Sequence, residues 1–371
     1  MTSKVLVVDT KYSQCASKMP EIFDFGGLDV SGKTVLIKPN LLFYTEPEQG
    51  LNTHPTLLKA IVEECERRGA KKVYLGDNAG QVMYGDSKSA FYESAGMEVL
   101  GDYYVNLGID LEPYELKSVS HMVYISKLLR QVDVVINVPK FKTHGLVGIS
   151  GATKNTFGYL PGAQKSKMHY LAKTYELFAK VLVEVHMIRK PDLNITDGII
   201  GQEGRGPFSR KLRYMGQLLV SKDPVAADSV LCSMIGFQPS DIPHLRIAQE
   251  EGLGTYTDVE VIGKPRIMPD FVLPPNSDTP WAINGDNGVL TPSLIRDAHR
   301  TVIEVNPETC MQCGKCAEEC PVGAIDMKEG FPVMNGTPCA SCHACQEACP
   351  VKALVLQSTF TGEVRQAPFY K

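Results

Sequence analysis

Eight of the eleven cysteines fall in two runs that share one spacing. The runs read CMQCGKCAEECP from Cys310 and CASCHACQEACP from Cys339, so each follows C-x2-C-x2-C-x3-C-P. Three thiolates in one tight loop can bind three irons of a [4Fe-4S] cube. The fourth cysteine of each run lies too far along its helix to complete the same cube. The pattern therefore predicts two [4Fe-4S] clusters that exchange their fourth ligands.

The exchange defines two predicted ligand sets. One cluster takes Cys310, Cys313, Cys316 and Cys349, and the other takes Cys339, Cys342, Cys345 and Cys320. A zinc site would need four ligands in two pairs instead, and a disulfide framework would need an oxidising compartment. Because the chain opens on the strand-like VLVVD without a signal peptide, we expect a reducing, anaerobic cytoplasm. Two such clusters suit electron hopping, although they could also serve only to hold the fold together.

A second candidate for chemistry is the basic stretch from Val134 to Tyr175, which contains no Asp or Glu. Lysine is a compact charge that suits phosphate or carboxylate. The glycines of the stretch would let the backbone approach a ligand. We predict a pocket for an anionic substrate or cofactor here, and the alternative is a solvent-exposed basic loop. The basic residues are Lys140, Lys142, His144, Lys154, Lys165, Lys167, His169 and Lys173.

These residues must be positioned by strands and helices. Thr34–Lys38, Lys72–Leu75 and Val132–Val138 read as buried strands, and helical segments alternate with them. This alternation predicts an α/β fold with a largely parallel sheet and flanking helices. Ligands of such sheets bind at the carboxyl ends of the strands, where polar residues recur. Asn155 of the basic stretch is assigned to the same site. The residues assigned to cofactor or ligand binding are Lys38, Asn40, Asp77, Lys140, Lys142, Asn155 and Asp197.

Length and charge limit the possible classes. A chain of 371 residues is long enough for two or three domains. A net charge of -4 argues against nucleic-acid binding, and no apolar run is long enough to cross a membrane. A proline-rich connector at 264–300 separates a predicted α/β domain at 1–263 from a small α+β domain at 301–371 that carries the cysteine runs.

The cysteine-bearing region resembles the bacterial two-[4Fe-4S] ferredoxin domain, and both runs match it without a gap. The region of about residues 1–265 is similar to the DUF362 family. That resemblance implies a fold and a ligand site but no reaction. The matching segments are Lys38-Pro39-Asn40, NVPKFKTHGLVGISGATKNTFG (Asn137–Gly158), the helix of His169, Asp197-Gly198, the E-G-x-G-P run Glu203–Pro207 and the D-P-x-A-x-D run from Asp223.

A more distant similarity concerns Lys154. The lactate racemase family carries a histidine, a Gly-rich stretch that ends in lysine, Pro-Gly and a second histidine. His144, Ser150–Lys154, Pro161-Gly162 and His169 occur here in that order. The resemblance implies that Lys154 tethers a nickel-pincer nucleotide, with His144 and His169 as metal ligand or acid/base. The sequence departs from the family at Ala152-Thr153, beside the lysine.

Two functions fit these features. The first is an iron–sulfur oxidoreductase that exchanges electrons with a soluble donor or acceptor and passes them through two clusters to the anionic ligand. His144, His169 and Lys154 would then be the catalytic residues, since imidazole titrates near neutral pH. The second is a non-catalytic electron carrier or assembly protein with a ligand-binding α/β domain. The remaining histidines have no role in either function; they are His54, His121, His186, His244, His299 and His343.

Overall fold

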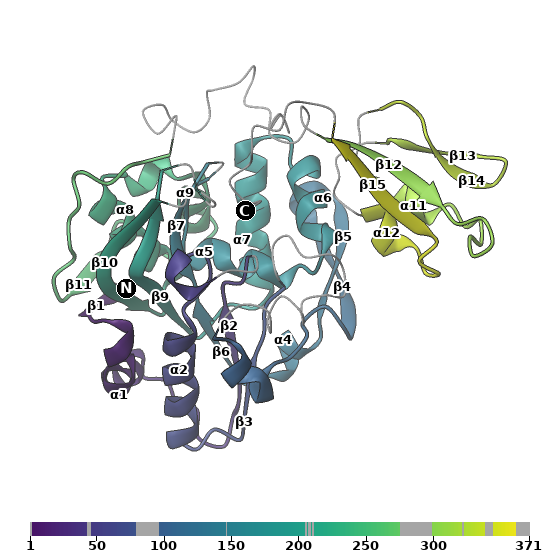
Figure 1. Ribbon diagram of the computed structural model, residues 1–371. Coiled ribbons are helices and arrows are strands. Elements are labelled where there is room, and N and C mark those ends of the chain that lie inside the picture. The colour runs from purple at the N-terminus through teal and green to yellow at the C-terminus, as the bar shows by residue number, and fades with distance from the viewer. Residues whose placement is uncertain are drawn as a thin grey trace. The chain divides into compact units, whose positions relative to one another are not determined.

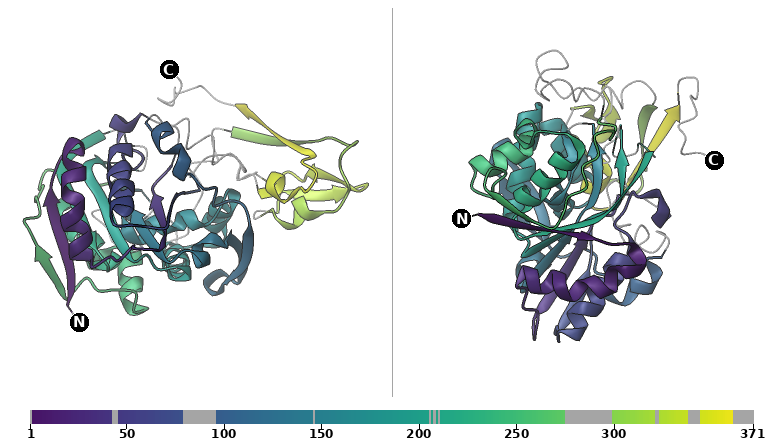
Figure 2. Two further views of the ribbon diagram at one scale, coloured as in Figure 1. Left: turned by 90° about the horizontal axis from the view of Figure 1, so that it is seen from below. Right: turned by 90° about the vertical axis from the view of Figure 1, so that its left-hand side faces the viewer.

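The structure is a computed structural model in which the chain forms two compact units. The first unit is Met1–Lys165 with Thr174–Val289, and the second is Ser166–Lys173 with Leu290–Lys371. Figure 1 labels the elements, and Figure 2 gives two further views. The residues that the structure describes are 2–42, 46–78, 96–145, 147–204, 206, 209, 211–274, 299–320, 323–337 and 344–360.

One nine-stranded sheet organises the first unit, and its main path runs β11-β1-β10-β9-β6-β2-β3. β7 pairs with β9 and β8 pairs with β7. The pairings β2–β3, β2–β6, β6–β9, β7–β9 and β1–β11 are parallel, whereas β10 is antiparallel to both its neighbours and β8 to β7. The predicted α/β fold with a largely parallel sheet is confirmed. The bounds are β1 Ser3–Asp9, β2 Thr34–Pro39, β3 Lys72–Leu75, β6 Val134–Val138, β7 Lys140–His144, β8 Gly148–Ser150, β9 Leu193–Glu203, β10 Lys211–Ser221 and β11 Val259–Ile262.

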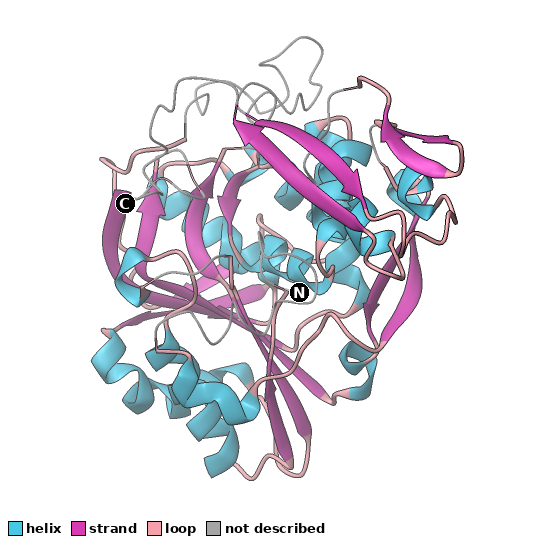
Figure 3. Ribbon diagram, turned by 45° about the vertical axis from the view of Figure 1, so that its right-hand side comes forward, coloured by secondary structure: helices cyan, strands magenta, loops and turns pink. Residues whose placement is uncertain are grey.

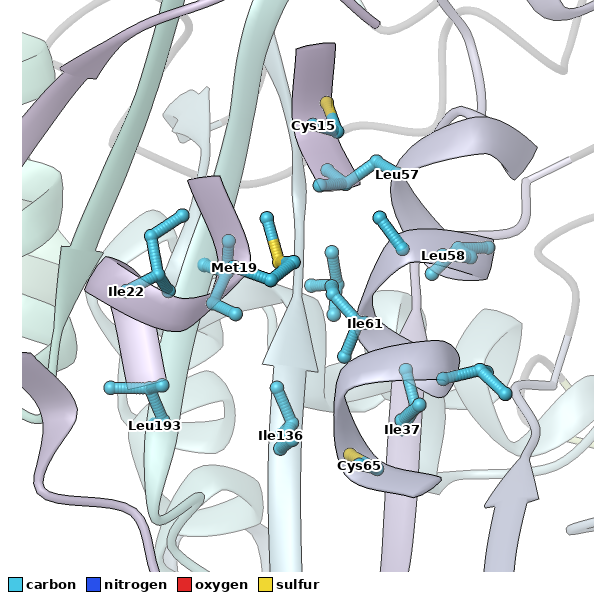
Figure 4. Packing of buried hydrophobic residues seen from close by; sticks show 14 of the residues in the cluster. Cys15, Met19, Ile22, Ile37, Leu57, Leu58, Ile61, Cys65, Ile136 and Leu193 are labelled. Atoms are coloured by element: carbon cyan, nitrogen blue, oxygen red, sulfur yellow. The ribbon is translucent and has the colours of Figure 1, made fainter. Parts of the chain in front are cut away.

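Helices cover both faces of this sheet. In β1, Leu6 and Val8 join one core, and the alternate residues Val5 and Val7 join the other. The first core packs α1 (Cys15–Gly26) and α2 (Pro55–Arg67) against the sheet, as Figure 4 shows in close-up. The second core packs α7 (Tyr175–Ile188), α8 (Pro224–Ile235) and α9 (Pro243–Glu250) on the opposite face.

The helix α2 follows the expected capping pattern. Pro55 occupies the first turn, where a missing backbone N–H costs no helical hydrogen bond. The ring of His54 accepts a hydrogen bond from Thr56 N at 3.2 Å and so caps the helix. The buried residues Leu57, Leu58 and Ile61 lie on its inner face (Figure 4).

Shorter elements complete the first unit. The hairpin β4–β5 is antiparallel and separate from the main sheet. The one-turn helix α5 packs between the sheet and α7 and α8, and α6 continues into the second unit. The bounds are β4 Leu111–Leu116, β5 His121–Ser126, α4 Leu128–Gln131, α5 Ala152–Asn155 and α6 Ala163–Leu171, with 3-10 turns at Tyr12–Gln14, Pro47–Gln49, Glu98–Tyr103, Lys117–Val119, Thr156–Tyr159 and Pro239–Asp241.

The second unit is a small α+β structure. The strands pair antiparallel as β12–β15 and β13–β14, and the short helices α11 and α12 pack against each other. Cys316, Ile325, Cys345 and Leu354 form its core. Figure 3 separates the helices from the strands by colour. The bounds are β12 His299–Val305, α11 Lys315–Glu318, β13 Ile325–Lys328, β14 Phe331–Met334, α12 Ala344–Ala348 and β15 Leu354–Phe360.

The domain limits predicted at 263 and 300 stay a prediction. Of the predicted connector, residues 264–274 contribute the buried Met268 and Phe271 to the second core of the first unit. Residues 275–298 lie outside the described residues. Across the described parts of the chain, no helix is both long and apolar enough to span a bilayer.

Candidate functional site

The carboxyl ends of neighbouring strands bring the predicted ligand-binding residues together. The strand pairing places Lys38 of β2 opposite Asn137 of β6, and Asn137 opposite Asn194 of β9. Lys140 of β7 lies opposite Asp197 of β9 in the same way. The polar side chains therefore meet at one edge of the sheet, as expected for parallel strands.

Lys38 and Asp77 form a buried ion pair at this edge. Lys38 Nζ donates to Asp77 Oδ1 at 2.7 Å and to the Pro39 carbonyl at 3.0 Å, and both side chains are at most 2% exposed. Asp77 Oδ2 also accepts from Leu41 N at 2.8 Å. Burial lowers the pKa of Lys38 and raises the pKa of Asp77, and the opposite charge of each partner counteracts that shift. The pair is neutral as a whole.

Lys140 and Asp197 form a second buried pair, 3.0 Å apart. The hydroxyl of Tyr12 lies between them, since it accepts from Lys140 Nζ at 2.7 Å and donates to Asp197 Oδ1 at 3.0 Å. The Tyr12 ring stacks on His54 with 3.6 Å between the ring centroids. Burial and the Asp197 charge raise the pKa of the Tyr12 phenol, so the hydroxyl keeps its proton.

Lys142 differs from these two lysines because its partners are neutral. Its amine donates to Asn40 Oδ1 and to the Leu51 carbonyl, both at 2.7 Å, and its side chain is only 1% exposed. Burial lowers the pKa of Lys142 well below its ordinary value, and the positive charges of Lys154 and Lys140 lower it further.

Lys154 lies on α5 and keeps part of its surface exposed. Within the described residues its amine has no hydrogen-bond acceptor and no carboxylate partner. Burial lowers its pKa to about 8, and the neighbouring Lys38 adds to the shift. At pH 7 the amine is therefore mostly an ammonium ion, and it is close enough to neutrality to lose its proton in mild base.

The carboxylate of Asp228, from α8, holds α5 in place. It accepts hydrogen bonds from Ala152 N at 2.6 Å and Thr153 N at 2.9 Å. Burial raises the pKa of Asp228 to about 6, although these two hydrogen bonds oppose the rise. Asp228 thereby caps the first turn of the helix that carries Lys154. Local sequence patterns do not predict this role, because Asp228 and Thr153 are 75 residues apart.

Glycines in the basic stretch make room for buried carboxylates of the chain itself. A Cβ atom at Gly151 would lie 2.1 Å from Asp228 Oδ1, and one at Gly158 would lie 2.2 Å from Asp77 Oδ1. Neither position can accept a side chain without displacing a charged group. At these two positions the structure therefore differs from the expectation that glycine admits a bound ligand.

Asn155 ties α5 to the strand ends. Its Nδ2 donates to Asn137 Oδ1 at 2.8 Å and to the Pro39 carbonyl at 3.2 Å. Asn137 in turn donates to the Ala152 carbonyl and to Asn194 Oδ1. Asn155, predicted to bind a cofactor, thus makes its observed hydrogen bonds within the protein and positions the adjacent Lys154.

The catalytic roles assigned to His144 and His169 stay a prediction, and the structure shows where the histidines lie. His144, at the end of β7, is 8% exposed, and His169 lies on the part of α6 that belongs to the second unit. His186 and His244 were given no role, yet both are fully buried. Among the described residues, His186 Nε2 and both ring nitrogens of His244 have no hydrogen-bond partner. Helical periodicity alone does not separate them from core residues.

Described cysteines of both runs come together in the second unit. Cys316 is buried and Cys313 is exposed. Burial raises the pKa of the Cys316 thiol, and the nearby Cys313 and Cys349 raise it further. Thiols from both runs are therefore neighbours, as the exchanged ligand set requires.

Two further observations concern metal binding. Cys320 Sγ and Cys349 Sγ each accept a hydrogen bond at 3.2 Å, from Ala324 N and Ala353 N, so the two fourth cysteines have the same local geometry. Within the described ranges, no three His, Cys, Asp or Glu side chains converge on a single metal ion. A cube spreads its thiolates over four irons and does not draw them to one atom. Cys339 and Cys342 lie outside the described residues.

The fold and the cysteine site together define an iron–sulfur protein with an α/β unit. Residues 35–233 match the family described as "Domain of unknown function (DUF362)". The chain belongs to this DUF362 family, as its sequence motifs indicated. Residues 303–326 match the family described as "4Fe-4S binding domain". The match contains the first cysteine run, and it indicates an iron–sulfur cluster and electron transfer.

Two known proteins show the extent of the similarity. The "Thylakoid-associated protein sll1697" of Synechocystis sp. is 31% identical over 232 residues, which are 60% of this chain and 69% of that protein. A crystal structure of a Thermotoga maritima protein aligns with a TM-score of 0.38 and 9% identity. That alignment covers 66% of this chain and 60% of the other, and at this score it carries no argument.

Proposed function

We propose that this protein passes electrons through two [4Fe-4S] clusters to an anionic small molecule held in the α/β unit. The electrons come from, or return to, a soluble partner protein in a reducing cytoplasm. Lys142 and Lys154 bind the anion, and His144 supplies a proton. The clusters provide electrons one at a time when bound.

The charge balance at the strand ends is the observation that carries the proposal. Lys38 and Lys140 are neutralised by Asp77 and Asp197. Neither Lys142 nor Lys154 has a carboxylate partner within the described residues. Desolvation disfavours the protonated form of both amines, so an anionic ligand would stabilise that form.

The second cluster is supported by the duplication in the cysteine region. Cys345 of the second run is buried in the same small core as Cys316 of the first run. The matching hydrogen bonds at Cys320 and Cys349 indicate that both fourth cysteines are presented alike. The repeated cysteine spacing and this shared feature of the two fourth cysteines support two clusters of the same type.

An anaerobic analysis of iron and ligand binding tests the proposal. The purified protein should contain about eight iron atoms, because each [4Fe-4S] cube holds four. The oxidised protein should bind an oxyanion, and Lys154→Met should weaken that binding without changing the iron content. Iron near four atoms per chain would refute the second cluster. Unchanged anion binding in Lys154→Met would refute the ligand site.

A non-catalytic carrier is the second candidate, and one observation favours it. Six of the seven residues assigned to cofactor binding make hydrogen bonds or ion pairs with one another, and Asn155 bonds to that network. Such internal bonding suits a structural role. Turnover of reduced partner protein with and without candidate anions separates the two functions, since a carrier exchanges electrons at the same rate in both cases.

A further inference from the structure

Two polar groups, one on α5 and one on α9, have no hydrogen-bond partner in the described structure. His244 on α9 is fully buried, and neither of its ring nitrogens has a hydrogen-bond partner in the described structure. The Lys154 amine on α5 also lacks an acceptor there. Leaving buried polar groups unpaired is unfavourable, so native proteins normally supply a partner.

The two groups belong to helices that pack against each other, α5 and α9. His244 is held neutral because burial lowers its pKa to about 3, and the positive charge of Lys154 contributes to this shift. A neutral imidazole has one N–H to donate. With a pKa this far below that of Lys154, the ring is too weak a base to remove the Lys154 proton. Its available role is therefore that of a hydrogen-bond donor.

One oxyanion would satisfy both groups. Its negative oxygen would accept from the Lys154 ammonium and from the His244 N–H, and its charge would offset Lys154 together with Lys142. We propose that Lys154 and His244 form the two sides of a subsite for the phosphate or carboxylate group of the ligand. This inference rests on the proposed anion site and adds His244 to it as a binding residue.

The test is a calorimetric titration of the anaerobically purified full-length protein at pH 7, once with inorganic phosphate and once with acetate. The tighter of the two probes identifies the oxyanion class. Lys154→Met and His244→Phe should each weaken binding of that probe by roughly tenfold or more, because each removes a charge-assisted or buried hydrogen bond. His244→Gln should retain most of the affinity, since its amide can still donate.

The control variant is Lys59→Met, which removes an exposed lysine of α2 and should leave the affinity unchanged. Far-UV circular dichroism checks that each variant folds, and His244→Gln keeps the comparison meaningful if His244→Phe does not fold. For His244→Gln, affinity below one tenth of the wild-type value would then argue against the donor role.

The pH dependence provides a second readout. Wild-type affinity should fall above pH 8 as Lys154 loses its proton. The same fall should persist in His244→Phe and be absent in Lys154→Met. Unchanged affinity in His244→Phe, with weakened binding in Lys154→Met, would overturn the inference and leave the proposed function in place. Failure of both probes to bind the wild-type protein would overturn both.

Discussion

Replacing Asp77 by Asn should lower the free energy of unfolding of the first unit more than a substitution at a surface ion pair does. The substitution keeps the shape of the side chain but leaves the Lys38 amine, which is 0% exposed, without its counter-charge. Removing one partner of a buried pair typically costs about 3–5 kcal/mol. The Lys38 pKa should fall further, because the Asp77 charge now opposes the effect of burial on it.

The matched surface change is Glu63→Gln on α2. Glu63 pairs with Lys59 at i,i+4, and both side chains are about half exposed. An exposed helical pair of this kind contributes only about 0.3–0.5 kcal/mol. The two substitutions change the same kind of charge, so the difference between their effects measures the consequence of burial.

The assay is urea unfolding followed by far-UV circular dichroism under anaerobic conditions. The double variant Lys38→Met, Asp77→Asn removes both charges, keeps an acceptor for Leu41 N and should recover much of the stability lost in Asp77→Asn. Equal free energies of unfolding for wild type and Asp77→Asn would refute the reasoning. So would a double variant that is less stable than Asp77→Asn alone, since the unpaired lysine would then not be the cause.

Three further predictions concern the strand ends, the buried histidines and the clusters. Gly158→Ala should cost about 1–3 kcal/mol in urea unfolding, because the new Cβ would lie 2.2 Å from Asp77 Oδ1; an unchanged midpoint would contradict this. His186 has its pKa lowered to about 4 by burial, so its neutral form stabilises the fold above pH 6.5. That contribution, about 3 kcal/mol at most, is lost as the pH falls from 6.5 towards 4. His186→Phe should show a smaller loss of stability over that range, and an identical slope would argue against the buried neutral ring. Cys320→Ala should lower the iron content of anaerobically purified protein towards about four atoms per chain. If the fourth ligands are exchanged, Cys349→Ala should remove the spectroscopic signal of the other cluster only.

Much of the architecture could be predicted from local patterns. Short β-branched runs alternating with amphipathic helices indicate an α/β sheet because burial on both faces favours such residues. The antiparallel strand β10 between β1 and β9 could not be predicted in this way, since strand direction depends on which segments pair and not on their composition. The connector was predicted from local composition alone, and Met268 and Phe271 within it pack into the core.

At the candidate site, too, the sequence predicts residue types and the tertiary structure decides their partners. A lysine in the sequence carries a charge, but its function depends on what lies opposite. Lys38 meets Asp77 at a separation of 39 residues, and Lys140 meets Asp197 at 57. Both lysines were predicted to bind a ligand, and both are paired within the protein. Lys142 and Lys154, from the same stretch, have no such carboxylate among the described residues.

The sequence by itself determined the cysteine chemistry, because ligands a few residues apart in one loop are brought together by the chain itself. It also determined the class of fold and the concentration of positive charge near Lys154. Only the tertiary structure decided which of those charges are neutralised and that His244 is buried beside Lys154 without a partner. These properties depend on contacts between distant segments, and desolvation acts on a side chain only once those segments have packed around it.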